Sequence, residues 1–234
     1  MKVGILQADS VMAQFEHEFG DYPGMFQDVL SNASSRDIEF AVYDVEHEQY
    51  PNQIDECHGY VITGSRKSVY DDEPWIHRLR DYVVALHKAR IKLVGICFGH
   101  QIVAMALGGN TEAADAGWGV GVHESHLITS KPYMQPPLSS LAAIVSHKDQ
   151  VTHLPDDAEL LATSDFCPNS MFQIQEHILT YQGHPEFCKG YSRALMDMRE
   201  DILGEEVYRQ GVDSLNKDMH SEILAKWIVQ FIEA

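Results

Sequence analysis

Long apolar runs are missing from this sequence, and no stretch approaches the roughly 18 residues that a membrane-spanning helix needs. Internal repeats, low-complexity tracts and a clear interdomain linker are missing as well. Residues 1–6 look like a first β-strand and lack the apolar core and cleavage site of a signal peptide. We therefore expect a protein that is located in the cytoplasm and does not associate with membranes.

Positively charged residues are scarce: 17 Lys and Arg stand against 35 Asp and Glu, which gives a formal net charge of −18. An anionic surface repels phosphate backbones, so no nucleic-acid partner is expected. No long run of one sign occurs. The acidity therefore fits a solvated surface, with an acidic docking face as the alternative.

The cysteines form no CxxC pair and show no metal-ligand spacing, so no metal site is expected. Free thiols are expected in a reducing compartment. A phosphate-cradling glycine loop of the Walker type is also absent, so an ATP-dependent synthase is not built into this chain. The four cysteines are Cys57, Cys97, Cys167 and Cys188.

Short apolar runs alternate with longer amphipathic stretches in the first hundred residues, and the runs are typical of parallel strands buried on both faces. They predict strands at residues 2–8, 39–45, 59–63 and 92–97. The amphipathic stretches predict helices at residues 22–33 and 74–90. This alternation predicts an α/β fold in which helices cover a mainly parallel sheet.

The second half has a different texture, with shorter strands joined by polar and Pro-rich turns. Strands are predicted at 121–129, 142–146 and 159–164, and a hairpin at 171–175 and 178–182. Residues 189–232 are expected to be mostly helical, and the apolar spacing within 221–231 indicates a core-facing helix. We expect one domain over residues 1–234, with a mostly helical C-terminal extension at about 189–234.

A nucleophile candidate stands where the strand at 92–97 ends. Cys97 follows that apolar strand, small residues surround it, and an apolar helical stretch comes next. This strand–turn–helix elbow would project the thiol out of the sheet, and the helix N-terminus would favour the reactive thiolate. The backbone N–H of Phe98 would point to a forming oxyanion. The alternative is a cysteine that is merely packed at a strand end.

A thiolate nucleophile needs a base, and the base needs an orienting group. His184 and Glu186 directly follow an expected strand, and side chains two residues apart in an extended segment face the same way. Glu186 can therefore orient His184, which can exchange a proton with Cys97. Most of the 13 histidines are expected to be surface or structural, so the pairing with the cysteine elbow carries this prediction.

At these residues the sequence resembles the class I glutamine amidotransferases. The Gly-x-Cys-x-Gly-x-Gln signature of that family is matched by Gly95, Cys97, Gly99 and Gln101, and its His-Pro-Glu by residues 184–186. The resemblance implies a catalytic triad of Cys97, His184 and Glu186. It also implies a flavodoxin-like three-layer sandwich and hydrolysis of a γ-carboxamide through a γ-glutamyl thioester, without metal or organic cofactor.

Two further segments are similar to the family. The loop after residues 59–63 would supply a second oxyanion-hole N–H from Ser65 or Gly64, although many members have Gly-Gly-Pro where this chain has Gly64-Ser65-Arg66. Residues 146–151 resemble a stretch that lines the glutamine pocket. This likeness implies that Gln101, Ser146 and His147 hold the γ-glutamyl group, with a ligand-free loop histidine as the alternative for His147.

The physiological reaction stays open between three readings. One is glutaminase activity whose partner is a separate synthase subunit, and another is a γ-glutamyl peptidase that acts on glutathione-type compounds. A non-catalytic binding or regulatory protein on the same scaffold is the third, against which the complete triad argues. Arg66 and Lys67 lie beside the expected pocket, where they either bind a substrate carboxylate or are solvated loop charges.

Overall fold

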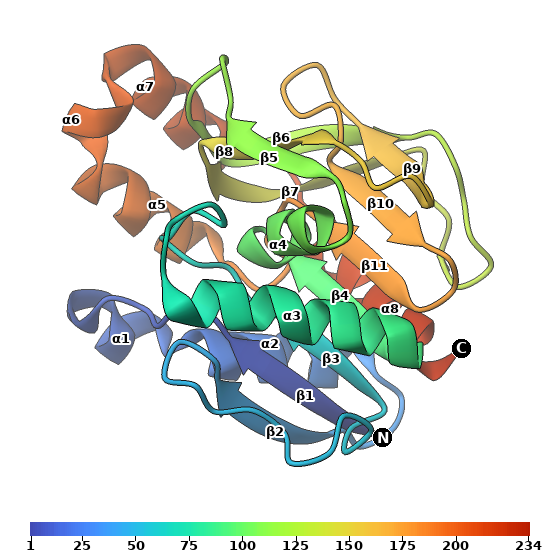
Figure 1. Cartoon of the computed structure of the whole chain (residues 1–234). Coiled ribbons are helices and arrows are strands. Elements are labelled where there is room, and N and C mark those ends of the chain that lie inside the picture. Colours follow the sequence, from blue (N-terminus) through green and yellow to red (C-terminus); the bar gives the residue numbers. More distant parts are fainter.

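A nine-stranded sheet runs through the molecule in the order β2-β1-β3-β4-β11-β10-β9-β6-β7 (Figure 1). The computed structural model describes residues 1–234. Five neighbouring strands are parallel: β1 (Lys2–Gln7), β2 (Glu39–Asp44), β3 (Gly59–Ile62), β4 (Lys92–Ile96) and β11 (Ile178–Tyr181). Antiparallel strands extend the sheet: β10 (Met171–Ile174), β9 (Ala158–Thr163), β6 (Gly119–Leu127) and β7 (Ser140–His147).

Helices cover both faces of the parallel part of the sheet (Figure 1). On one face lie α3 (Pro74–Ala89) and α4 (Phe98–Ala106), and on the other lie α2 (Tyr22–Ala33) and α8 (Ser221–Glu233). A second, two-stranded sheet of β5 (Asn110–Ala113) and β8 (Asp149–His153) packs against α4. The predicted α/β class, with a mainly parallel sheet between helical layers, is confirmed.

Helix α3 shows why these segments are helical. Pro74 occupies the first turn, where a missing N–H costs nothing, and Arg90 ends the helix in the left-handed conformation. Its buried residues recur every three or four positions and face the sheet, as an amphipathic helix requires. They are Trp75, Ile76, Leu79, Val83 and Leu86.

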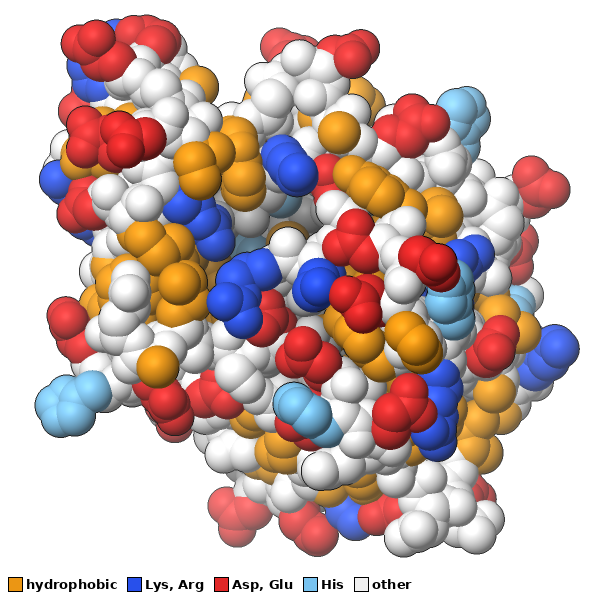
Figure 2. All heavy atoms as spheres, turned by 60° about the vertical axis from the view of Figure 1, so that its left-hand side comes forward, with side chains coloured by type: hydrophobic (Ala, Val, Ile, Leu, Met, Phe, Trp, Pro, Cys, Tyr) orange, Lys and Arg blue, Asp and Glu red, His pale blue; other side chains and the backbone are white.

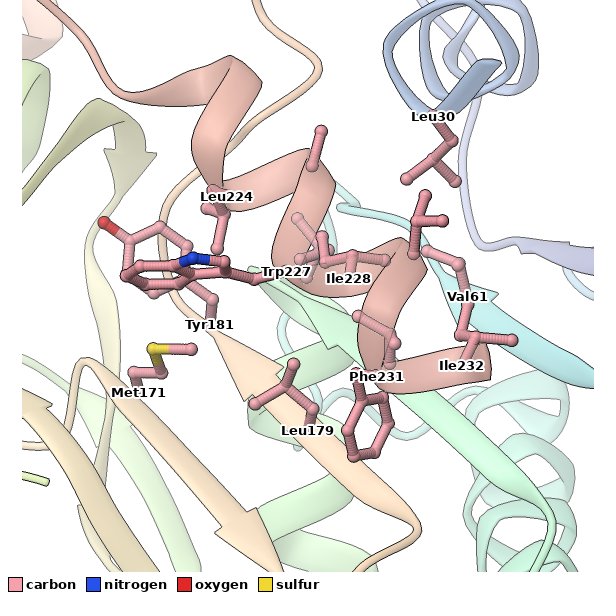
Figure 3. Packing of buried hydrophobic residues seen from close by; sticks show 14 of the residues in the cluster. Leu30, Val61, Met171, Leu179, Tyr181, Leu224, Trp227, Ile228, Phe231 and Ile232 are labelled. Atoms are coloured by element: carbon pink, nitrogen blue, oxygen red, sulfur yellow. The ribbon is translucent and has the colours of Figure 1, made fainter. Parts of the chain in front are cut away.

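Helix α8 closes the core on the opposite face of the sheet (Figure 3). Trp227 is fully buried, and it belongs to one cluster with Val61 of β3 and Leu179 of β11. Truncating a buried Trp to Ala costs about 3–5 kcal/mol, so this helix contributes much of the stability of the sheet. The predicted core-facing role of residues 221–231 is confirmed.

The remaining helices gather beyond one end of the sheet (Figure 1). These are α1 (Ala13–Phe19), α5 (Lys189–Met198), α6 (Glu200–Leu203) and α7 (Glu205–Ser214). Helices α5 and α7 contact β6, and α5 also contacts α1 and β7. None of the helices is both long and apolar enough to cross a membrane.

Candidate active site

Three neighbouring parallel strands bring the predicted catalytic residues together. Gly64 follows β3, Cys97 follows β4, and His184 follows β11, and these strands lie side by side in the sheet. Ligands of open α/β sheets bind outside the carboxyl ends of the strands, where these three residues stand. The topology therefore places residues 64, 97 and 184 around one point, although up to 120 residues separate them in sequence.

The backbone at Cys97 has the form of a strained elbow. Its φ of 53° and ψ of −101° are unusual for a residue with a side chain, and such strain gathers at functional sites. A Cβ on Gly99 would lie 2.5 Å from the carbonyl oxygen of Ile62. A Cβ on Gly95 would collide with the carbonyl of Gly99. The two signature glycines thus allow β4, β3 and α4 to meet closely behind Cys97.

His184 is held from several directions. Its Nδ1 lies 2.7 Å from Oε1 of Glu186, and both side chains are buried. Its ring stacks on Phe187 with centroids 3.9 Å apart, and its backbone N–H donates to the carbonyl of Ile144 on β7. A Cβ on Gly64 would lie 2.9 Å from Cε1 of His184, so only glycine leaves room for this ring.

The electrostatics favour a charged imidazole. Burial lowers the pKa of His184, but the Glu186 carboxylate, the Cys97 sulfur and the hydrogen bonds to both outweigh burial and raise this pKa well above its usual value. A protonated His184 beside Cys97 stabilises the thiolate, which is the nucleophilic form of cysteine. The second oxygen of Glu186, Oε2, is buried without a hydrogen-bond partner.

Unengaged backbone N–H groups lie in the pocket segments next to Cys97. The N–H groups of Gly64, Ser65 and Phe98 donate no hydrogen bond within the protein. Phe98 is the first residue of α4, so its N–H points out of the helix N-terminus, where partial positive charge favours an anion. These are the three groups expected from the sequence as oxyanion donors, and none of them is engaged in another hydrogen bond.

The predicted substrate residues Gln101, Ser146 and His147 line the same pocket as Cys97 and His184. The Asp149 carbonyl accepts from Nε2 of Gln101 at 2.8 Å and pairs with Nδ1 of His147 at 3.0 Å. A carbonyl only accepts, so His147 carries its proton on Nδ1, and its buried Nε2 is left as an unpartnered acceptor. Burial lowers the pKa of His147 to about 3, so the ring is neutral.

Asp149 itself was not expected at the site from the sequence. Its carboxylate accepts from the hydroxyls of Ser68 at 2.5 Å and Tyr70 at 3.0 Å, and it is buried at the pocket. These bonds tie the turn between β7 and β8 to the loop after β3. The only sequence signal was its place three residues after Ser146 in the resembling stretch.

The two cations singled out in the sequence both have carboxylate partners. Arg66 lines the pocket, but its Nε and a terminal nitrogen donate to Asp9 at 2.8 and 2.6 Å. Lys67 lies outside the pocket lining and pairs with Glu73 at 2.7 Å. Their charges are therefore largely neutralised within the protein.

Two sets of residues in or directly behind this pocket differ in character. We name Gly64, Cys97, His184 and Glu186 the elbow group, all of which are buried. We name Trp118, Ser146, Lys148 and Arg199 the rim group, all of which are half-buried or exposed. Lys and Arg side chains gather around a hollow on this face (Figure 2).

Arg199 and Trp118 in the rim group were not found from the sequence. Arg199 caps the C-terminal end of α5, and Trp118 stands between Gly117 and Gly119 at the start of β6. Nothing in their local sequence links them to Cys97. An aromatic residue flanked by two glycines was the one available signal. No cluster of three or more His, Cys, Asp or Glu side chains suited to a metal ion occurs in the structure.

Comparison with known proteins agrees with the geometry. The family model for glutamine amidotransferase class-I matches residues 21–196. γ-Glutamyl peptidase 3 of Arabidopsis thaliana is 33% identical over 81% of this chain and 78% of its own length. One subunit of the glutamine-hydrolysing GMP synthase of Methanothermobacter thermautotrophicus is 32% identical over 48% of this chain and 61% of its own length.

The fold has a counterpart among solved structures. A glutamine amidotransferase of Thermotoga maritima superposes with a TM-score of 0.78, at 19% identity, over 99% of both chains. At that level of sequence identity, the structural similarity is evidence for the fold only. The family model covers three quarters of the chain and includes the cysteine elbow and the His-Pro-Glu segment. The chain belongs to the glutamine amidotransferase class-I family.

Proposed function

We propose that the protein hydrolyses the γ-amide bond of γ-glutamyl compounds through a thioester on Cys97. The observation that carries this proposal is the constellation at the strand ends. A strained cysteine elbow faces a histidine that a buried glutamate holds at 2.7 Å, with unengaged backbone N–H groups beside it. This arrangement supports the assignment of a nucleophile, a base, an orienting group and oxyanion donors for acyl transfer.

The reaction proceeds in two halves. The Cys97 thiolate attacks the γ-carbonyl carbon, and the N–H groups of Phe98 and Ser65 or Gly64 stabilise the oxyanion. The C–N bond then breaks, and protonated His184 gives its proton to the departing amine. Water, deprotonated by His184, attacks the thioester, which releases glutamate and returns the proton to the Cys97–His184 pair.

Glu186 keeps the correct proton on His184 throughout. Its Oε1 receives the Nδ1–H, so the other ring nitrogen is the one that exchanges protons with Cys97 and the substrate. Because the glutamate is buried and acts through the ring, it is a positioning residue. The backbone bond from His184 to Ile144 and the stacked Phe187 fix the ring in the same orientation.

We place the substrate among γ-glutamyl peptides. Similarity to a γ-glutamyl peptidase extends over four fifths of this chain, whereas similarity to the GMP synthase relative extends over about half. A peptidase also needs no second active site to receive ammonia. The competing reading is a glutaminase that delivers ammonia to a separate synthase subunit, and the GMP synthase relative motivates it.

The test is release of glutamate together with covalent labelling. The unaltered protein should release glutamate from a γ-glutamyl dipeptide and should gain one adduct from an electrophilic glutamine analogue, located by intact mass and peptide mapping. Cys97→Ala should lose both the turnover and the adduct. Cys188→Ser is the matched control, because Cys188 is the exposed cysteine and serine preserves its cap on α5.

Full turnover by Cys97→Ala, or an adduct on another cysteine in the unaltered protein, would refute the mechanism. Ammonia release from glutamine that appears only with an added synthase subunit would favour the partnered glutaminase. Binding of γ-glutamyl compounds with neither turnover nor labelling would favour a non-catalytic protein.

A further inference from the structure

Arg199 is the unpaired arginine of the pocket. No carboxylate lies within 4.0 Å of its guanidinium, and its single hydrogen bond goes to Oγ of Ser146 at 3.0 Å. Its guanidinium carbon lies 5.4 Å from the Trp118 ring centroid. Arg66, by contrast, forms a two-point ion pair with Asp9. A half-buried cation without a counter-charge is costly, so it is a natural receptor for a ligand carboxylate.

The surrounding charge strengthens this reading. The chain has a formal net charge of −18, and an anionic substrate would be repelled by most of its surface. Lys148 in the pocket lining also lacks an ion pair, so two uncompensated cations face the hollow. Burial lowers the pKa of Arg199. The usual pKa of an arginine is so high that the side chain nevertheless keeps its positive charge.

The pocket surface beside His184 leads toward Arg199. The departing amine must lie beside the His184 ring, which hands it a proton. One face of that ring is stacked on Phe187, and Leu195, which also lines the pocket, lies one helical turn before Arg199. A substituent on the departing amine would therefore run over Phe187 and Leu195 to the rim. The deeper residues Gln101 and His147 are nearly fully buried and suit the γ-glutamyl side.

A larger groove begins where this surface ends. Trp118 lines both the catalytic pocket, of about 90 Å³, and a neighbouring groove of about 610 Å³ between β6 and α7. Lys217 and His123 line that groove. The pair of Trp118 and Arg199 thus stands at the junction between the space for the scissile bond and the space for a longer departing group.

We infer that Arg199, supported by Ser146 and Trp118, binds the carboxylate of the departing amino acid or peptide. Ser146 then serves the departing side of the substrate, in place of the γ-glutamyl side that the family resemblance implied. This inference rests on the proposed function and deepens it, because it names the side of the substrate that is selected. Glutamine and simple γ-glutamyl amides have no carboxylate on the departing side and gain nothing from this contact. Arg199 is a specificity-determining residue, distinct from the groups that break the bond.

The experiment compares two substrates that differ only in that carboxylate: γ-glutamyl-alanine and γ-glutamyl-ethylamide. Arg199→Gln should raise KM for γ-glutamyl-alanine by about tenfold or more, the loss of one charge-assisted hydrogen-bonded pair, with kcat within about twofold. Its kinetics with γ-glutamyl-ethylamide should be unchanged. Arg199→Lys, which keeps the charge, should fall between Arg199→Gln and the unaltered protein.

Arg193→Gln is the matched control, since Arg193 lies on the same helix, is exposed, and pairs with Asp197 away from the pocket. It should leave both substrates unaffected. An equal rise of KM for both substrates in Arg199→Gln would overturn the inference, because Arg199 would then bind the carboxylate of the γ-glutamyl group. Unchanged KM for both would also overturn it. Failure of the unaltered protein to hydrolyse either substrate would instead refute the proposed function.

Discussion

The elbow group and the rim group contribute to one pocket but are built in different ways. Gly64, Cys97, His184 and Glu186 are buried, and a Cβ on Gly64 would collide with His184. Arg199 and Lys148 of the rim lack ion pairs and remain accessible. Bond breaking needs fixed geometry, whereas recognition needs groups that can still gain a partner. Substitutions in the elbow group should therefore lower the turnover of every substrate equally. Substitutions in the rim group should affect some substrates more than others.

The largest effect should come from Glu186→Gln. An amide in place of the carboxylate removes the charge that stabilises protonated His184, so kcat should fall by about 10²- to 10⁴-fold for every substrate. The pKa of His184 is raised by Glu186 and Cys97, so losing one of these charges lowers it. The alkaline limb of the kcat/KM profile should thus move to lower pH, as measured with two γ-glutamyl substrates.

Glu176→Gln is the control for this change, because Glu176 is exposed in the turn between β10 and β11, at the other end of the sheet. It should leave the profile in place. A Glu186→Gln variant that lost activity on one substrate only would break the division between the two groups. An unmoved alkaline limb would show that Glu186 does not set the proton affinity of His184.

A smaller effect, on stability, should come from Gly99→Ala. The new Cβ would lie 2.5 Å from the carbonyl oxygen of Ile62, and backbone cannot yield cheaply, so the free energy of unfolding should fall by about 1–3 kcal/mol or more. Gly24→Ala is the matched control in α2, where nothing lies within 4 Å of the new Cβ. It should stabilise the protein by about 0.5–1 kcal/mol. Urea unfolding of both variants measures the difference, and equal stabilities would contradict the tight packing behind the elbow.

The smallest effect concerns two neutral, buried histidines: His100 in α4 and His147 in the pocket lining. Burial lowers the pKa values of His100 and His147 to about 3, and the nearby His147 contributes to the shift at His100. The unfolded chain takes up protons near the usual histidine pKa of about 6.5, but the folded chain does not until about 3, so acid favours unfolding. Each histidine should reduce the free energy of unfolding by up to about 1.4 kcal/mol per pH unit below about 6.5.

His100→Asn separates this contribution from that of the carboxylates. Asn can keep a hydrogen bond to Thr180, which His100 makes through Nδ1 at 2.9 Å, but it does not titrate. Between pH 6 and 5 the free energy of unfolding of the variant should fall less steeply than that of the unaltered protein. The difference in slope should correspond to the uptake of about one proton fewer on unfolding. Identical slopes in urea unfolding at both pH values would contradict the neutral, buried state of His100.

The sequence was most informative where burial is strongest. The predicted strands 2–8, 39–45, 59–63 and 92–97 agree with β1 to β4 within a residue, and the predicted hairpin agrees with β10 and β11. The apolar runs of β1, β3, β4, β10 and β11 report burial on both faces of the sheet, which leaves a clear pattern. Strand β2 lies at the edge of the sheet and is only partly buried, yet its apolar residues were sufficient to reveal it.

The elements that were missed lack that pattern. Helix α1 has no buried residue, and β5 and β8 are mostly polar strands of the small sheet. Hydrophobic periodicity cannot reveal an element that buries little apolar surface. These segments are ordered by contacts from distant parts of the chain, such as the pairing of β5 with β8.

The candidate site divides in the same way. The placement of Gly64, Cys97 and His184 was foreseeable because each follows a strand that the sequence reveals. Arg199 was not, because Glu200 and Asp201 follow it directly and suggest an ordinary solvated ion pair. In the structure it pairs with neither and turns to Ser146, 53 residues away.

Helix α5 begins three residues after Glu186, with Cys188 as its cap, and Arg199 closes it. The residue proposed to transfer protons, His184, and the residue proposed to bind the departing carboxylate, Arg199, therefore lie on one short stretch of chain, at separate positions of it. Substitutions at the C-terminal end of α5 should change substrate preference and leave the bond-breaking residues unaltered. Because Ser146 and Trp118 support Arg199 from other parts of the chain, exchanging residues 189–204 between relatives together with these two side chains should transfer the preference for the departing group while Cys97 stays unchanged.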